Sequence, residues 1–169
     1  MSSVIPSPPE RTAEALARET SVPGLLRATC TELVEVLDAH ACAISRLIGE
    51  VLVELVEYAP SRKSLHLGHG YLVPDYPLTQ EVIEQGEPRL VSLLDDDPDP
   101  SEAVLLRELG FDSLLMLPLR SMGECWGLVE VYLGHGRSFR DEDARVAERV
   151  AARAGELIEQ LQRGPVAER

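Results

Sequence analysis

Histidine and aspartate side chains supply the clearest candidates for metal chemistry in this chain. His66 and His69 stand three positions apart in a stretch with two glycines, and an acidic run, DDDPDP, occupies positions 95–100. No cysteine or nearby carboxylate completes a tetrahedral zinc set around the histidines. The acidic run lacks the glycine and the terminal glutamate of an EF-hand calcium loop. The sequence therefore predicts no metal site, and it favours a solvated acidic loop at 95–100.

The cysteines offer a second kind of chemistry, which depends on reactive thiols. Cys30, Cys42 and Cys125 are an odd number and form no CxxC pair, so structural disulfides and thioredoxin-type chemistry are not expected. Cys30 falls on a buried helical stripe, and the other two fall in or at the edge of predicted strands. If those strands pair antiparallel, Cys42 and Cys125 lie near opposite ends, which disfavours a disulfide between them. Thiol catalysis remains an alternative only.

Composition and charge exclude several partner classes. The chain has 169 residues, 44% of them hydrophobic, and a formal net charge of −13. This length suits one domain with a real core. The excess of acid argues against nucleic acids and against anionic membrane surfaces, both of which attract clustered Lys and Arg. No apolar run is long enough to span a bilayer, and the N-terminus lacks the features of a secretory signal. We expect a cytoplasmic, reduced protein.

The elements that must position these side chains follow from apolar periodicity and from stop signals. Ser21 is a good N-cap for a helix with helically spaced apolar residues. Gly86 and Pro88 end a helix that Pro77 opens, and Ser101 is the expected cap of the next one. Helices are expected at 10–20, 21–37, 77–86, 101–109 and 141–162, strands at 41–47, 51–58, 90–93, 114–119 and 125–133, and a long loop at 59–75. Neighbouring strands joined by tight turns indicate an antiparallel sheet and the α+β class.

This order, together with several short signatures, resembles the GAF domain family. The signatures are GEP at 86–88 before a strand and an acidic loop, LGFDSLLMLPL at 109–119, WGLVEVY at 126–132, and Phe139 followed by Asp143. The resemblance covers about residues 21–162. It implies a five- or six-stranded antiparallel sheet, with the N- and C-terminal helices on one face and short helices and loops covering a pocket on the other. We therefore divide the chain into an extension at 1–20, a domain at 21–163 and a tail at 164–169.

The sequence departs from the ligand motifs of well-known GAF subgroups. Of the cyclic-nucleotide pattern, only Phe139 and Asp143 remain, and both are expected to act structurally, the carboxylate by favouring the N-terminus of the last helix. The motifs that surround a bilin are not found near any cysteine. The resemblance therefore implies an unidentified small-molecule ligand and names no cofactor.

The last predicted strand has two different faces, because successive side chains alternate. One face holds only apolar or small residues and suits packing under helices: Cys125, Gly127, Val129, Val131 and Leu133. The other face is mixed: Trp126, Leu128, Glu130 and Tyr132. The mixed face either lines a pocket, where a few polar groups orient a ligand, or simply faces solvent.

The candidate ligand-binding residues come from this mixed face and from the segments expected to cover it. They are Trp126, Glu130, Tyr132, Tyr71, Tyr76, Arg46 and His69. Arg46 is the one strong positive charge inside a predicted strand. On the pocket face it would bind an anionic group or pair with Glu130, and otherwise its guanidinium would lie in solvent.

The resemblance implies a non-enzymatic sensory or regulatory domain. A ligand bound between the sheet and its cover would shift the first and last helices, which would pass the signal to a signalling protein or a fused effector domain. The length and Ala-rich stripe of the last helix favour a homodimer through the first and last helices. Two alternatives stay open: a thiol-dependent small-molecule reductase of the same fold, and a dimerisation scaffold that binds no ligand.

Overall fold

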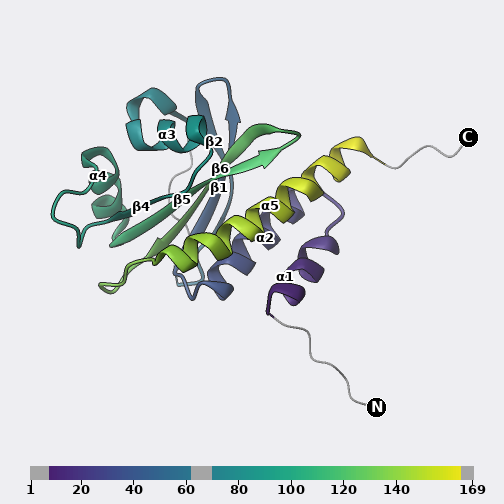
Figure 1. The fold of residues 1–169 in the computed structure, drawn as a ribbon, viewed down its shortest axis with the longest axis horizontal. Helices are drawn as coiled ribbons and strands as arrows, with labels where there is room; N and C mark the ends of the chain where they lie inside the picture. Colours follow the sequence, from purple (N-terminus) through teal and green to yellow (C-terminus); the bar gives the residue numbers. More distant parts are fainter. Residues whose placement is uncertain (1–7, 62–69, 165–169) are drawn as a thin grey trace, which may run out of the picture.

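The fold is a six-stranded antiparallel sheet with helices on both faces (Figure 1). The computed structural model describes residues 8–61 and 70–164. The strands lie in the order β3-β2-β1-β6-β5-β4. Their bounds are β1 Ala41–Ile48, β2 Val51–Tyr58, β3 Tyr71–Leu72, β4 Arg89–Ser92, β5 Ser113–Ser121 and β6 Glu124–Leu133. The α+β class and the antiparallel sheet expected from the sequence are confirmed.

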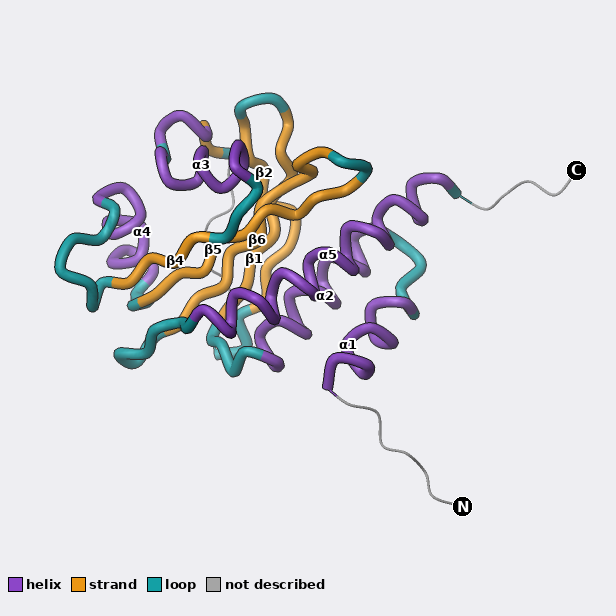
Figure 2. The backbone as a smooth tube through the Cα atoms, viewed as in Figure 1, coloured by secondary structure: helices purple, strands orange, loops and turns teal. Residues whose placement is uncertain are grey.

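One face of the sheet is covered by the two long helices, which run side by side across it (Figure 2). These are α2, Val22–Val36, and α5, Asp141–Arg163. A shorter helix, α1, Pro8–Ala17, packs on both of them. The apolar cluster between helices and sheet includes Leu33, Ile44, Val129 and Ile158. This cluster, the helix-side core, is built by the apolar stripe of each helix and by every second residue of the strands.

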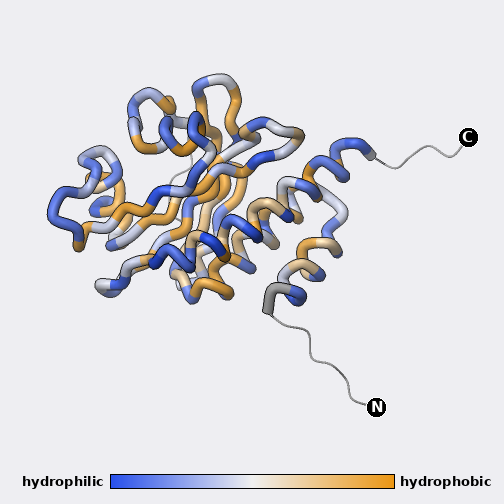
Figure 3. Tube along the Cα trace, in the orientation of Figure 1, coloured by the Kyte–Doolittle hydropathy of each residue, from blue (hydrophilic) through white to orange (hydrophobic). Residues whose placement is uncertain are grey.

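The opposite face is covered by short elements, as the family resemblance implied. These are the 3₁₀ turn η1, Val73–Asp75, and the helices α3, Pro77–Gln85, and α4, Pro100–Leu109. They enclose a second apolar cluster, the cover-side core, which includes Leu106, Met116 and Leu128. The acidic loop before α4 is hydrophilic and lies at the outer edge of this cover (Figure 3).

Local capping explains where most helices begin and end. The Ser21 side chain accepts a hydrogen bond from the Gly24 amide, and α3 and α4 end at Gly86 and Gly110 in the left-handed conformation that glycine adopts without a Cβ clash. The cap of α4 corrects the expected one: Asp99, two residues before Ser101, accepts from the Glu102 amide. Pro100 then fills the first helical position, where no amide is needed.

The segment predicted as a loop at 59–75 contains two unexpected short elements. β3 pairs with the edge of β2, where Leu52 opposes Tyr71, and η1 follows at once. A two-residue strand carries no alternation, so periodicity could not reveal it. Within residues 8–61 and 70–164, no helix combines the length and the apolar character that crossing a bilayer requires.

A β-bulge interrupts the alternation of β6 near its start. Leu119 opposes Gly127, but Arg120 opposes Cys125, so Trp126 is the extra residue on the bulged strand. The Trp126 side chain consequently belongs to the helix-side core instead of the face that holds Glu130. The backbones of β6 and β1 approach each other so closely here that a Cβ on Gly127 would overlap the Ser45 carbonyl oxygen.

Candidate functional site

A buried carboxylate lies at the centre of the polar groups on the cover side of the sheet. Glu130 of β6 is 3% exposed. Its Oε1 accepts a hydrogen bond from the Tyr71 hydroxyl at 2.8 Å, and its Oε2 accepts one from the Tyr132 hydroxyl at 3.0 Å. Burial raises the pKa of Glu130, while the two tyrosine hydrogen bonds lower it and leave a net upward shift. Both carboxylate oxygens therefore have donors, but neither donor is a cation.

Four of the predicted site residues come together around this carboxylate. Glu130 and Tyr132 project from β6 to the same face, and β3 brings Tyr71 across β2 and β1 toward them. Tyr76, just after η1, packs edge-on against Tyr71 with ring centroids 5.1 Å apart. Burial is the largest cause of the raised pKa of each of the three tyrosines, and the Glu130 charge adds to it. The structure thus assembles a tyrosine–carboxylate cluster in which Tyr71 of β3 and Glu130 of β6 are 59 positions apart along the chain.

A second buried carboxylate joins the cluster from α4, and sequence reasoning missed it. Glu102 is 1% exposed, and its Oε1 accepts a hydrogen bond from the Thr79 hydroxyl of α3 at 2.8 Å. The Met116 sulfur of β5 lies 3.4 Å from the same hydroxyl. Burial, followed by repulsion from Glu130, raises the pKa of Glu102 to about 7. Its place in the first turn of a helix suggested an ordinary surface charge, so the sequence carried no signal for its burial.

Two further carboxylates of β2 share this face of the sheet. Ala43 of β1 opposes Glu57 on one side and Glu130 on the other, so all three project to the cover side. Glu54, half-buried, has a pKa raised to about 8 by burial and by its hydrogen bond with Glu57. One of its oxygens, Oε2, is buried without a hydrogen-bond partner among the residues that the structure describes. The cover side therefore concentrates acidic groups whose charged forms are disfavoured.

Arg46 and Trp126 do not join this cluster, which corrects the expected arrangement. The bulge sends Trp126 to the helix side, where the Arg46 guanidinium carbon lies 4.3 Å from the centre of the indole ring. Arg46 Nη1 also donates to the Trp126 carbonyl oxygen at 2.7 Å. Arg46 therefore forms a cation–π contact with Trp126 and does not pair with Glu130. His69, the remaining candidate, lies outside the described residues, as does His66.

The thiols lie on the helix side or near the β5–β6 turn, away from the tyrosine–carboxylate cluster. Cys30 and Cys42 are fully buried in the helix-side core. Burial raises the pKa of Cys42 and, to a smaller extent, that of Cys125. Raised pKa values keep thiols protonated and unreactive. Within the described part of the chain, no group of three or more His, Cys, Asp and Glu side chains is arranged to hold a metal ion.

Comparison with solved structures found several that share this fold. It is similar to the phycocyanobilin-bound GAF domain from a cyanobacterial phytochrome, with 16% identity and a TM-score of 0.78 over 94% of this chain and 97% of that one. It is also similar to the chromophore-binding domain of a Stigmatella aurantiaca bacteriophytochrome mutant, with 17% identity and a TM-score of 0.74 over 94% of this chain. The corresponding domain of an unusual bacteriophytochrome from R. palustris gives 11% identity and a TM-score of 0.78 over 94% of this chain. At these identities the likeness concerns the fold.

The chain spans 59% of the length of the Stigmatella structure and 62% of the R. palustris structure. Comparison with curated proteins found no match. The family model of the GAF domain matches residues 22–158, which include α2, the whole sheet with its cover, and α5 up to Ile158. This match covers most of the chain and agrees with the fold and with the signatures in the sequence. The chain therefore belongs to the GAF domain family.

Proposed function

We propose that this chain is a non-enzymatic sensory domain that binds a small molecule between the sheet and the layer formed by η1, α3 and α4. The observation that carries the proposal is the buried Glu130 carboxylate, held by the hydroxyls of Tyr71 and Tyr132. Purely structural cores rarely bury a carboxylate without a cationic partner, because its desolvation is costly. Polar groups set in an apolar surround are typical of ligand sites.

The chemistry of the cluster favours a ligand that presents hydrogen-bond donors or a positive charge. Glu130, Glu102 and Glu54 all have raised pKa values because of burial. A donor or cation beside them would lower those pKa values and recover part of the desolvation cost. Arg89, on the edge strand β4, forms ion pairs with Glu81 at 3.7 Å and with Glu87 at 3.4 Å. Within residues 8–61 and 70–164, it forms no ion pair with Glu130, Glu102 or Glu54.

The solved neighbours that bind bilins suggest one ligand class to test. Covalent attachment through Cys30 or Cys42 is not supported, since both thiols lie in the core on the opposite side of the sheet from Glu130. Cys125 lies next to the β5–β6 turn and opposes Arg120. Given these positions of the three thiols, we propose that a bilin at this site would be held non-covalently.

The alternation of β6 supports a proposed route for the signal through the sheet. Glu130 faces the proposed ligand, while its neighbours Val129 and Val131 pack in the helix-side core against α2 and α5. A shift of β6 on ligand binding would therefore change the packing of both helices, provided the ligand has different affinities for the two arrangements. We propose that α2 and α5 also form a homodimer interface and pass the change to a signalling protein or fused effector domain in the cytoplasm.

Two alternatives predict different behaviour. A thiol-dependent reductase of this fold needs an exposed cysteine with a low pKa, whereas Cys42 and Cys125 have raised pKa values. A dimerisation scaffold without ligand needs a cover side filled by the protein's own side chains. The stacking of Phe111 on Tyr132, with ring centroids 5.2 Å apart, is the contact that favours such filling.

Native mass spectrometry of the purified protein tests the proposal directly. We expect extra mass that disappears on denaturation, or that appears after incubation with a metabolite extract, and that is reduced in Glu130→Gln and Tyr71→Phe variants. Arg145→Gln, an exposed change on α5, is the matched control and should retain the ligand. Bound mass that is equal in all four proteins would place the ligand elsewhere. A bare protein after incubation with extract would favour the scaffold.

A further inference from the structure

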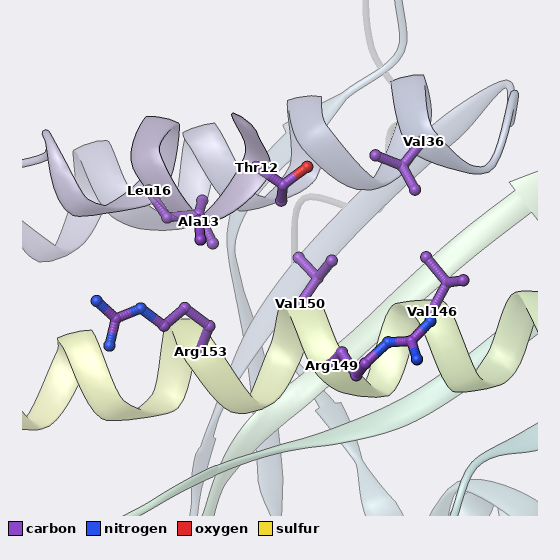
Figure 4. Close-up of a pocket in the computed structure, with 8 residues that line it drawn as sticks. All are labelled: Thr12, Ala13, Leu16, Val36, Val146, Arg149, Val150 and Arg153. Carbon is purple, nitrogen blue, oxygen red and sulfur yellow. The ribbon is translucent and has the colours of Figure 1, made fainter. Parts of the chain in front are cut away.

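A hollow on the outer side of the helix layer is separate from the proposed ligand site. It encloses about 210 Å³ between α1, the end of α2 and the middle of α5 (Figure 4). Its apolar walls come from three helices and consist of Ala13, Leu16, Val36, Val146 and Val150. We call this hollow the α1–α5 groove. Its apolar lining favours an apolar occupant, because covering that surface removes it from water.

Two arginines give the α1–α5 groove its charge. Arg149 and Arg153 are four residues apart on α5, so they lie on the same helical face, and both line the groove (Figure 4). Arg153 pairs with Glu156 of its own helix at 3.0 Å. Arg149 takes part in none of the ion pairs formed within residues 8–61 and 70–164. The chain as a whole has a net charge of −13, whereas the charged side chains that line this groove are both positive.

The remaining polar group of the groove is already engaged. The Thr12 hydroxyl of α1 donates to Glu32 of α2 at 3.1 Å. Glu32 is therefore held on the α1–α2 side, whereas the guanidinium groups project from α5 (Figure 4). A ligand that spans the groove meets apolar side chains along its length and positive charge on one side.

We propose that the α1–α5 groove binds a small amphiphilic anion, with an aliphatic body against Leu16, Val36 and Val150 and a carboxylate on Arg149. A planar guanidinium matches a carboxylate in geometry and forms two parallel hydrogen bonds with it, which favours a carboxylate over a neutral head group. The proposal does not rest on the ligand site beside Glu130. It concerns a different face of the sheet and a different ligand chemistry.

Such a ligand would contact α1 and α5 at once. α1 is joined to the rest of the fold by its packing on α2 and α5, with Leu16 as its fully buried anchor. A bound amphiphile adds apolar contacts across this junction and would fix α1 on α5. Ligand binding should therefore raise the protection of the α1 amides from hydrogen exchange, because it opposes local opening of this helix.

Isothermal titration with octanoate tests the head group and the site together. Octan-1-ol and octylammonium have the same tail with a neutral and a positive head. We expect octanoate to bind, octan-1-ol to bind about fivefold more weakly, and octylammonium to bind more weakly still, because exposed charge pairs are worth up to about this factor. High salt should reduce the preference for octanoate. Equal binding of octanoate and octan-1-ol would overturn the role of the arginines.

Substitutions locate the site. The double variant Arg149→Gln/Arg153→Gln should bring octanoate to the affinity of octan-1-ol. Arg107→Gln, an exposed change on α4 on the other side of the sheet, is the control and should change nothing. Ala13→Leu fills the groove with a helix-favouring residue and should weaken both probes, with circular dichroism confirming the fold. Methyl NMR should show octanoate-induced shifts at Val36, Val146 and Val150. No binding of octanoate, or shifts confined to Leu128 and Met116 in the cover-side core, would refute the proposal.

Discussion

A single buried carboxyl group, Glu102, links the site to stability. Its pKa of about 7 in the folded protein lies above that of an exposed glutamate. The sign follows from proton linkage: stability from this group is present at low pH and is lost as pH rises toward 7, because the folded state prefers the protonated form. Glu102→Gln removes the titration. We expect the variant to gain about 1–2 kcal/mol over the wild type between about pH 5.5 and pH 8.

Urea unfolding at several pH values measures this difference. Glu108→Gln, an exposed change on the same helix α4, controls for the loss of one negative charge and should show no comparable pH-dependent gain. A constant difference between Glu102→Gln and the wild type across this range would show that Glu102 has no raised pKa. It would also weaken the case that the cover side disfavours negative charge.

The contact between Arg46 and Trp126 sets a second prediction for individual residues. Arg46→Gln removes the guanidinium that lies over the indole and donates to the Trp126 carbonyl oxygen. We expect a loss of about 1–2 kcal/mol in the free energy of unfolding, together with a change in the Trp126 fluorescence. Binding of any ligand that Glu130→Gln weakens should be retained, since Arg46 is on the other side of the sheet. A loss of that ligand in Arg46→Gln would return Arg46 to the site.

Among the elements, the close approach of α5 to β5 depends on a glycine. A Cβ on Gly155 would overlap the Arg120 carbonyl oxygen, and the Ser121 hydroxyl donates to the Gly155 carbonyl at 2.9 Å. Gly155→Ala should therefore destabilise the fold by about 1–3 kcal/mol in thermal or urea unfolding, because the helix must move away from the strand. Helix propensity alone predicts the opposite sign.

An exposed position of the same helix provides the comparison. Ala152→Gly changes no packing within the chain and should cost about 1 kcal/mol through helix propensity. Both substitutions should thus destabilise α5, one by steric overlap and the other by backbone entropy. A stabilising effect of Gly155→Ala would show that the helix can lie farther from β5 than the structure has it.

The elements also show what the sequence could and could not reveal. Caps and stop signals such as Ser21 and Gly86 act through neighbouring backbone groups. A short stretch of sequence is therefore enough to predict where these helices begin and end. The side of the sheet that Trp126 occupies depends on the register of β5 against β6, which no local pattern encodes. Thr79 of α3 and Glu102 of α4 form a hydrogen bond between two helices packed on the sheet. This contact depends on tertiary structure, so local sequence patterns do not predict it. The sequence nevertheless predicts Tyr71, Tyr76, Glu130 and Tyr132 as one group. The family resemblance implies which segments cover the sheet face that carries Glu130 and Tyr132.

For the whole molecule, we expect association through α2 and α5. Light scattering after gel filtration should give twice the 18.6 kDa mass of the chain. A charge at an exposed small residue of α5, as in Ala152→Glu, should shift the population toward monomer if that helical face is the interface, since burying an unpaired charge is costly. Glu124→Gln, at the exposed start of β6, is the control. A monomer at all concentrations, or a dimer indifferent to Ala152→Glu, would contradict this interface.

The strand order has a consequence for folding during synthesis on the ribosome. The sheet consists of two consecutive three-stranded halves, β1 to β3 and β4 to β6, that meet where β1 pairs with β6, and this seam joins Ala41 to Tyr132. The first half must wait with an unpaired edge until β6 has been synthesised, because its partner is the last strand to emerge. Closing so long a loop slows folding. Chaperones that shield strand edges should therefore matter most for the nascent chain that ends between the two halves.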